Sequence, residues 1–184
     1  HCEGSYRSVY GQEATGRPWR LGRMSLACHG LNANLASRGG DTFARDQPPD
    51  LQADYVKANR PFNIKDWARN ESDPRWKFGV PPAGNANYAW IQHIISKLAP
   101  GGTAGIVMAN GSMSTNSGGE GDIRAQRVEA DRISCMVALP KQLLLSHAHP
   151  VSAGCFARDN TQGPEGETTR ARQCAGIAAA TQGD

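Results

Sequence analysis

Strand-like and helix-like segments alternate along most of this chain, and the short connections between them contain Gly or Pro. Apolar residues recur at helical spacing within residues 18–31 and again within residues 88–98. Residues 54–58 favour a strand, while the continuous apolar run over residues 103–108 is typical of a strand buried on both faces. The alternation predicts an α/β fold with a doubly wound, mainly parallel sheet, in which ligands bind beyond the carboxyl ends of the strands.

The remaining segments extend this pattern to about residue 157. Residues 6–10 favour the end of a strand, and the Pro-Gly-Gly sequence at 100–102 predicts a break between a helix and the next strand. Residues 122–132 favour a helix and residues 133–139 a strand. The Gly-rich residues 118–121 predict a flexible loop before a helix cap, because they lack the Lys-Ser/Thr ending of a phosphate-binding P-loop.

A chain of 184 residues is long enough for one domain with a substantial core. Its 39% hydrophobic and 20% charged residues are typical of a soluble globular protein. The net charge of +3 tolerates a phosphate backbone but does not indicate a self-sufficient DNA-binding surface. No apolar run reaches the roughly 18 residues of a membrane helix, and no signal-peptide core is evident, so we expect a cytoplasmic protein without a membrane partner.

The cysteines and two neighbouring histidines do not form a ligand pattern. The five cysteines stand at wide, irregular spacings without a Cys-x-x-Cys pair, which predicts reduced and mostly structural thiols. His147 and His149 are two residues apart, a spacing compatible with metal binding on a strand, but no third ligand is evident. The sequence therefore predicts no metal site.

The segment that follows the strand at 54–58 is the most informative. Residues 58–67 read Ala-Asn-Arg-Pro-Phe-Asn-Ile-Lys-Asp-Trp. The segment resembles the Asn-Pro-Pro-Phe motif of amino-group DNA methyltransferases, and its extension resembles the modification subunits of type I restriction systems, which are adenine-specific. An exocyclic amine on a purine ring is a poor nucleophile, because its lone pair is delocalised. Two oxygen acceptors for the amine hydrogens favour the tetrahedral geometry from which that lone pair attacks a methyl sulfonium.

The resemblance assigns a catalytic role to each of four residues. Asn59 would supply the side-chain amide oxygen and Arg60 the backbone carbonyl that accept the two amine hydrogens. Pro61 would make the turn rigid, and Phe62 would stack on the base after it has left the duplex. The tetrapeptide alone is also compatible with a turn that merely ends a strand, and the longer match favours the catalytic interpretation.

Arg60 departs from the family, which has proline at that position. The backbone carbonyl survives this change, but one fixed torsion is lost. The change also introduces a long cation beside a cationic cofactor.

Two acidic residues upstream are candidates for binding the cofactor S-adenosylmethionine. The segment around Glu13 resembles the end of the family's second strand, where a carboxylate binds the ribose hydroxyls. Asp41, with its neighbour Thr42, resembles the third-strand end, where an acidic residue contacts the adenine amine. Either acid taken singly is better explained as a solvated loop residue or a helix cap, and it is their order before Asn59 that supports cofactor binding.

The resemblance covers roughly residues 9–145. The family's glycine-rich turn, which wraps the methionine part of the cofactor, has no counterpart upstream of Glu13, so we expect a Rossmann-like methyltransferase fold that is N-terminally incomplete. Beyond residue 145 the match weakens, and the small residues at 152–154 are expected to pack a strand poorly. We expect residues 1–158 to form a partial catalytic domain and residues 159–184 a polar, loosely ordered tail.

The resemblance implies a site-specific enzyme that transfers a methyl group from S-adenosylmethionine to the exocyclic amine of adenine in DNA. It would act in a type I restriction-modification complex with a specificity subunit and a restriction subunit. Because the glycine-rich motif is absent, this chain alone is expected to bind the cofactor weakly or not at all. The alternative is a catalytically inactive fragment that serves as an interaction module. An unrelated nucleotide-binding α/β enzyme would require a Gly-rich turn that opens a helix, and none is in place.

Overall fold

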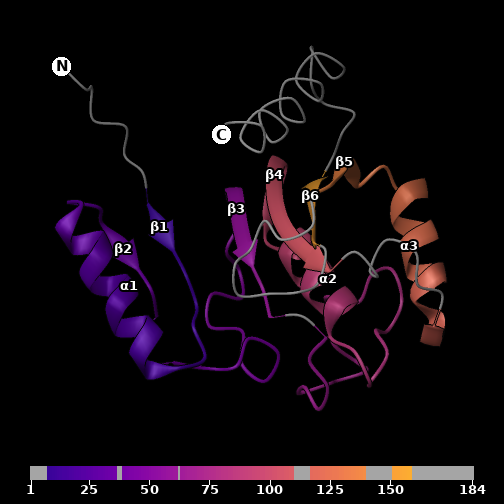
Figure 1. Cartoon of the computed structure of the whole chain (residues 1–184), viewed down its shortest axis with the longest axis horizontal. Helices are drawn as coiled ribbons and strands as arrows, with labels where there is room; N and C mark the ends of the chain where they lie inside the picture. Colours follow the sequence, from indigo (N-terminus) through magenta and orange to yellow (C-terminus); the bar gives the residue numbers. More distant parts are fainter. Residues whose placement is uncertain (1–7, 37–38, 62, 110–116, 140–150, 159–184) are drawn as a thin grey trace. The chain divides into compact units, whose positions relative to one another are not determined.

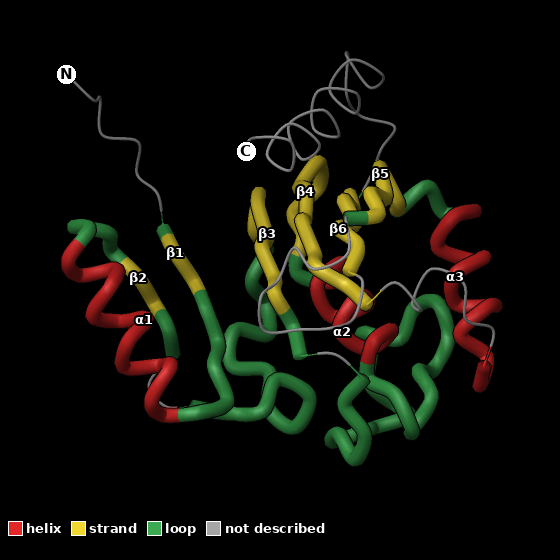
Figure 2. The backbone as a smooth tube through the Cα atoms, in the orientation of Figure 1, coloured by secondary structure: helices red, strands yellow, loops and turns green. Residues whose placement is uncertain are grey.

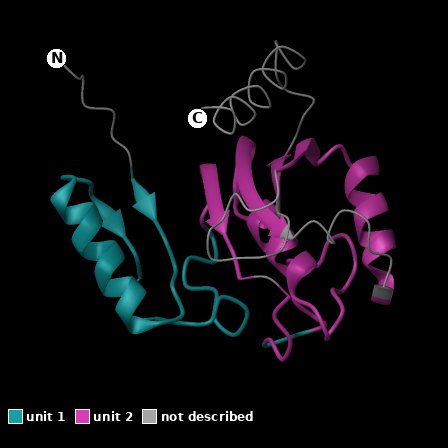
Figure 3. Ribbon diagram, in the orientation of Figure 1, with its two compact units in different colours: residues 1–50, 68–70 teal, residues 51–67, 71–184 magenta. Residues whose placement is uncertain are grey.

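The computed structural model of the chain contains two compact units (Figure 3). The first unit comprises residues 1–50 and 68–70, and the second comprises residues 51–67 and 71–184. The residues that the structure describes are 8–36, 39–61, 63–109, 117–139 and 151–158.

The first unit contains a strand, a helix and a second strand, namely β1 (Val9–Tyr10), α1 (Gly16–Cys28) and β2 (Ala33–Asn34) (Figure 2). β1 and β2 pair in parallel, so α1 is a crossover helix of the kind that parallel strands require. The indole Nε1 of Trp19 donates a hydrogen bond of 2.8 Å to the carbonyl oxygen of Leu35, which ties the helix to the segment after β2.

The second unit is built on a four-stranded sheet. Its elements are β3 (Ala53–Asn59), α2 (Asn87–Ser96), β4 (Leu98–Ala109), the short 3-10 helix η2 (Ser117–Gly119), α3 (Glu120–Glu129), β5 (Ile133–Ala138) and β6 (Val151–Ala157). The strand order is β3-β4-β6-β5 (Figure 1). β3 and β4 are parallel, and β6 is antiparallel to both of its neighbours, so β3, β4 and β5 share one direction. The α/β fold with a mainly parallel sheet is therefore confirmed.

The apolar core of the second unit lies where α2 packs against β4. The side chains of Tyr88 and Ile91 from α2 and of Ile106 and Met108 from β4 are almost fully buried. Burial contributes about 25 cal/mol per Å² of apolar surface, so this cluster stabilises the unit. Its buried members are Tyr88, Ile91, Ile94, Ile95, Leu98, Ala104, Ile106, Met108, Ile123 and Phe156.

β4 differs from its prediction in two respects. It begins at Leu98, so the Pro-Gly-Gly sequence at 100–102 lies inside the strand and does not separate it from α2. The pairing with β3 shifts register at this point, and Gly101 adopts a φ of 76°, which a β-bulge with glycine accommodates. The expectation of burial on both faces was also wrong, because Ala104 and Ile106 are buried whereas Gly105 between them is exposed.

β6 packs well despite its small residues. An added Cβ at Gly154 would lie 2.6 Å from the ring of Phe156 and 2.9 Å from Cε of Met108. Ser152 is fully buried in the same strand. The small side chains therefore allow β6 to approach its neighbours closely, and the prediction of poor packing was wrong.

The other predictions about the chain have mixed outcomes. Cys28 and Cys155 are free thiols, but Cys135 is disulfide-bonded, so the expectation of reduced cysteines fails there. His147, His149 and the tail at 159–184 lie outside the described residues. Within the described residues, no helix has the length and apolar character needed to cross a bilayer.

Candidate functional site

Asn59 is the last residue of β3 and lies at the carboxyl end of that strand. Its side chain is exposed, and its amide makes no hydrogen bond within the described part of the chain. Pro61 is exposed as well, and Phe62 lies outside the described residues. An exposed amide at the carboxyl end of a strand has its acceptor oxygen available to a ligand.

Arg60 points the other way, into the protein, and only 4% of it is exposed. Its Nη1 donates a hydrogen bond of 2.5 Å to Oδ1 of Asn87 and a longer one of 3.4 Å to the carbonyl oxygen of Pro61. Burial lowers the pKa of the guanidinium to about 10, so it remains charged at neutral pH. The cation at the position of the family's proline is therefore almost completely shielded from solvent.

Asn87 fixes the loop that follows β3 to the start of α2. Its Oδ1 accepts a second hydrogen bond of 3.2 Å from the backbone N–H of Asn63, and its Nδ2 donates one of 2.9 Å to Oδ1 of Asn63. The backbone N–H of Ala86 donates to the carbonyl oxygen of Ile64 at 3.0 Å. Asn63 itself has a φ of 51°, in the left-handed region that asparagine tolerates better than most residues. These bonds attach Asn63 and Ile64 to the start of α2.

The sequence did not single out Asn87. The available signal was a pair of asparagines, Asn85 and Asn87, at the start of a mainly apolar helix. Oδ1 of Asn85 accepts a hydrogen bond of 3.0 Å from the backbone N–H of Asn87, a common role of asparagine at a helix start. The contact between Asn87 and Arg60 spans 27 positions, so local pattern could not reveal it.

The extension of the motif has a structural role in the second unit. Trp67 is 8% exposed and packs edge-to-face on Trp76, with ring centroids 5.8 Å apart and an interplanar angle of 88°. Such an aromatic pair stabilises a structure beyond its buried area by about 0.5–1.5 kcal/mol. The sequence match over residues 58–67 therefore includes a residue that packs in the core, Trp67, as well as the residues predicted to be catalytic.

In the first unit, the two acidic candidates Glu13 and Asp41 lie near each other, because the backbone N–H of Gly40 donates a hydrogen bond of 3.0 Å to the carbonyl oxygen of Glu13. Oε1 of Glu13 accepts hydrogen bonds from the N–H and the hydroxyl of Thr15 at 3.0 and 2.9 Å. Only 9% of Thr42 is exposed. Both predicted segments thus meet in one place, although the Glu13 carboxylate already has local partners.

The side chain of Asp41 also has partners in its own loop. Oδ1 of Asp41 accepts hydrogen bonds of 2.7 and 3.3 Å from the backbone N–H groups of Phe43 and Ala44. The side chain of Asp41 is exposed, so its second carboxylate oxygen is open to solvent or ligand.

Gln12 holds these two segments together. Its Nε2 donates hydrogen bonds to the carbonyl oxygens of Gly40 and Arg45 at 3.0 and 2.7 Å, and its Oε1 accepts one of 3.1 Å from the N–H of Gln47. The end of β1 is thereby linked to the loop that follows β2 in sequence. The sequence did not indicate this role, since it depends on contacts between distant positions.

A cavity of about 470 Å³ opens beside this junction. Tyr10 and Asn34, the paired last residues of β1 and β2, both line it. Its volume falls in the range of roughly 300–1,000 Å³ that small-molecule and cofactor sites have. The predicted residues Glu13, Asp41 and Thr42 are not part of the lining, which consists of Tyr10, Gly11, Asn34, Ala36, Arg45, Asp46, Gln47, Pro48 and Pro49.

The chain shares the Rossmann-like fold of its structural neighbours. The structure is similar to that of a protein from Listeria monocytogenes assigned to the class I S-adenosylmethionine-dependent methyltransferases, with a TM-score of 0.63 over 84% of this chain and 45% of that chain at 13% identity. It is more similar to a type I restriction-modification methyltransferase subunit from Streptococcus thermophilus, with a TM-score of 0.73 over 83% of this chain and 34% of that chain at 25% identity.

The chain belongs to the N-6 DNA Methylase family, whose model matches residues 3–173. The methylase subunit of the type I restriction enzyme HindI from Haemophilus influenzae is 44% identical over 146 residues, which cover 78% of this chain and 33% of that protein. The chain thus spans about a third of the length of this relative. The family predicted from residues 58–67 is confirmed.

Proposed function

We propose that this chain forms part of an adenine-specific DNA methyltransferase, which transfers a methyl group from S-adenosylmethionine to the exocyclic amine of adenine in DNA. The observation that carries the proposal is the exposed side chain of Asn59 at the carboxyl end of β3, in a segment whose following residue, Arg60, bonds to Asn87. The relatives support this function over an inactive interaction module, because their names describe methylase subunits.

In this proposal, the amide oxygen of Asn59 and the backbone carbonyl of Arg60 accept the two hydrogens of the target amine. Both acceptors raise the nucleophilicity of the nitrogen by opposing delocalisation of its lone pair. Pro61 limits the freedom of the loop, and Phe62 provides a stacking face for the flipped base. The buried guanidinium of Arg60 substitutes for the missing proline by bonding to Asn87.

We further propose that the first unit holds the adenosine part of S-adenosylmethionine. The cavity of about 470 Å³ beyond β1 and β2 fits a group of that size, and its lining offers polar side chains such as Asn34 and Gln47. Glu13 and Asp41 do not line this cavity but lie at the junction beside it, from where they would bind the ribose and the adenine amine, with Thr42 as part of the same loop. The bound cofactor supplies an electrophilic methyl group on a sulfonium.

The partners of the complete protein are also part of the proposal. The HindI relative is a subunit of a type I restriction enzyme, so we infer DNA, a specificity subunit and a restriction subunit as partners of this chain in a full-length subunit. The modest net charge of +3 agrees with a division of labour in which another subunit supplies most of the DNA affinity.

The test is the substitution Asn59→Ala in a full-length subunit that carries this chain, assayed with labelled S-adenosylmethionine and DNA. We expect methyl transfer to fall by at least about 100-fold, as for the loss of one catalytic hydrogen-bond partner. The free energy of unfolding should stay within about 0.5 kcal/mol, because the side chain is exposed and unbonded.

The matched control is Gln52→Ala, which removes an exposed amide immediately before the other end of β3. This variant should retain both folding and transfer. Undiminished transfer in Asn59→Ala would contradict the role of Asn59, and equal losses in both variants would point to an effect on the strand as a whole.

A further inference from the structure

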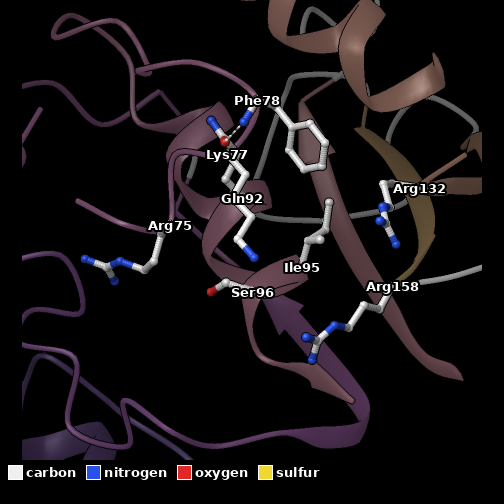
Figure 4. Close-up of a pocket in the computed structure, with 8 residues that line it drawn as sticks. All are labelled: Arg75, Lys77, Phe78, Gln92, Ile95, Ser96, Arg132 and Arg158. Atoms are coloured by element: carbon white, nitrogen blue, oxygen red, sulfur yellow. Dashed lines mark hydrogen bonds between the residues drawn. The ribbon is translucent and has the colours of Figure 1, made fainter. Parts of the chain in front are cut away.

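A small pocket whose lining includes several basic residues lies in the second unit (Figure 4). Arg132 directly precedes β5, and Arg158 directly follows the antiparallel β6, so both lie at the edge of the sheet where β4 begins with Leu98. Asn59 ends β3 at the opposite edge. This pocket is therefore separate from the loop to which we assign methyl transfer.

The pocket is too small for a cofactor. Its volume is about 70 Å³, whereas sites for drug-sized ligands and cofactors measure roughly 300–1,000 Å³. A cavity needs roughly 10–15 Å³ of such space to hold one water molecule, so the pocket has room for a group of about five heavy atoms. The lining consists of Arg75, Lys77, Phe78, Gln92, Ile95, Ser96, Arg132 and Arg158.

The charges around the pocket are unbalanced. Four of the lining residues are basic and none is acidic. Arg75 is neutralised, because its Nε and Nη2 both donate hydrogen bonds to the carboxylate of Asp73. Lys77, Arg132 and Arg158 have no carboxylate partner within the part of the chain that the structure describes. An anion bound among these three cations would relieve their mutual repulsion.

One donor at the pocket also lacks an acceptor. The Nε of Arg132 is buried, and no hydrogen-bond partner reaches it among the described residues. Leaving a charged donor unpaired in a buried position is unfavourable, and an oxyanion would supply the missing acceptor. Arg158 uses Nη1 to donate a hydrogen bond of 2.6 Å to the carbonyl oxygen of Leu98, and the other donors of its guanidinium remain for a ligand.

The backbone around the pocket is held in place. Gln92, which is 1% exposed, accepts a hydrogen bond of 3.0 Å from the N–H of Phe78 and donates one of 2.8 Å to the carbonyl oxygen of Gly79 (Figure 4). These bonds anchor the segment that carries Lys77. The N–H of Ala157 donates to the carbonyl oxygen of Arg132 at 3.1 Å. A site whose backbone is already ordered loses little entropy when a ligand binds.

We propose that this pocket binds one oxyanion of the phosphate class through Lys77, Arg132 and Arg158. A tetrahedral oxyanion presents several acceptor oxygens to guanidinium groups that approach from different elements. Inorganic phosphate and a phosphodiester of DNA share this chemistry, and the small volume favours the free ion, since the ester substituents of a phosphodiester need additional room.

The test measures thermal unfolding of the chain in increasing inorganic phosphate, against sodium chloride at matched ionic strength. We expect a saturable rise of the unfolding midpoint with phosphate, because a ligand that binds only the folded state stabilises it. Arg132→Gln and Lys77→Gln should each abolish or strongly reduce this rise. Lys57→Gln, which removes an exposed lysine from β3, should leave it intact.

Three outcomes would overturn the proposal. The first is an equal rise with chloride, and the second is a rise that persists in both pocket variants. The third is a rise that a short DNA duplex produces and phosphate does not, lost in Lys77→Gln. If Arg132→Gln fails to fold, Lys77→Gln decides, because that side chain is exposed. The readout does not involve methyl transfer, so it stands apart from the proposed function.

Discussion

The side chain of Asn87 makes three hydrogen bonds to the loop after β3, one to Arg60 and two to Asn63. Asn87→Ala removes an acceptor from a buried guanidinium and a donor and an acceptor from Asn63. We expect the free energy of unfolding to fall by about 1–3 kcal/mol, the cost of leaving buried polar groups unpaired. Urea denaturation of the chain measures this loss.

The control is the double variant Arg60→Pro/Asn87→Ala. It removes the buried charge and restores the residue that the family has at that position. This double variant should be more stable than Asn87→Ala alone. If it is equally destabilised, Asn87 does not act through Arg60.

Gly154 in β6 permits the close approach of Met108 and Phe156, since an added Cβ would lie 2.6–2.9 Å from their side chains. Gly154→Ala should lower the free energy of unfolding by about 1–3 kcal/mol through overpacking. The matched substitution is Gly105→Ala in the neighbouring β4, where an added Cβ meets nothing within 4 Å. This control should be neutral or slightly stabilising, and similar losses in both variants would contradict the packing argument.

At the scale of secondary structure, local periodicity was sufficient to predict three helices and two strands, namely α1, α2, α3, β3 and β5. A helix or a strand with one apolar face carries its pattern in consecutive residues. The start of β4 was not predictable, because residues 100–102 contain the usual signals of a turn and are accommodated by a register shift against β3. The packing of β6 depends on Met108 in another strand, which no local pattern contains.

The candidate site was predictable to a similar extent. The motif predicted that Asn59 lies at the end of a strand, and in the structure Asn59 is the last residue of β3. The burial of Arg60 and the role of Asn87 depend on a contact across 27 positions. The cavity beside β1 and β2 is formed by main-chain turns around Gln47 and by strand ends, so its lining differs from the acidic residues that the motif suggested.

The segment before α2 contains an acid-sensitive ion pair. The hydrogen bond from Arg75 holds the pKa of Asp73 below its ordinary value of 3.8. A carboxylate whose pKa is lowered on folding stabilises the folded state above the unfolded pKa, and this stabilisation is lost as the pH falls through the folded pKa. We therefore expect stability to decline below about pH 3.8, and Asp73→Asn to flatten part of that decline.

Urea denaturation of the unchanged chain and of Asp73→Asn between about pH 2 and pH 6 measures this difference. The range extends about two pH units to either side of the ordinary carboxylate pKa. Asp54→Asn is the comparison, because it removes an exposed carboxylate of β3 that has no partner among the described residues. A steeper acid decline in Asp73→Asn would contradict the assignment.

At the scale of the whole molecule, the chain combines two units that carry different parts of one proposed activity. The first unit has the cavity at the ends of β1 and β2, and the second has Asn59 at the end of β3. The chain covers 33% of its HindI relative, so the proposed activity is to be tested in a full-length subunit that carries this chain. The chain belongs to the N-6 DNA Methylase family. The central claim of the proposed function is therefore the chemical identity of the methylated product.

The most direct measurement is the nucleoside composition of DNA after incubation with a full-length subunit that carries this chain, its specificity subunit and S-adenosylmethionine. The DNA is digested to nucleosides, and the methylated bases are quantified by mass spectrometry. We predict N6-methyladenine as the product, absent when Asn59 is replaced by alanine. Methylated cytosine, or N6-methyladenine at an undiminished level in Asn59→Ala, would contradict the account.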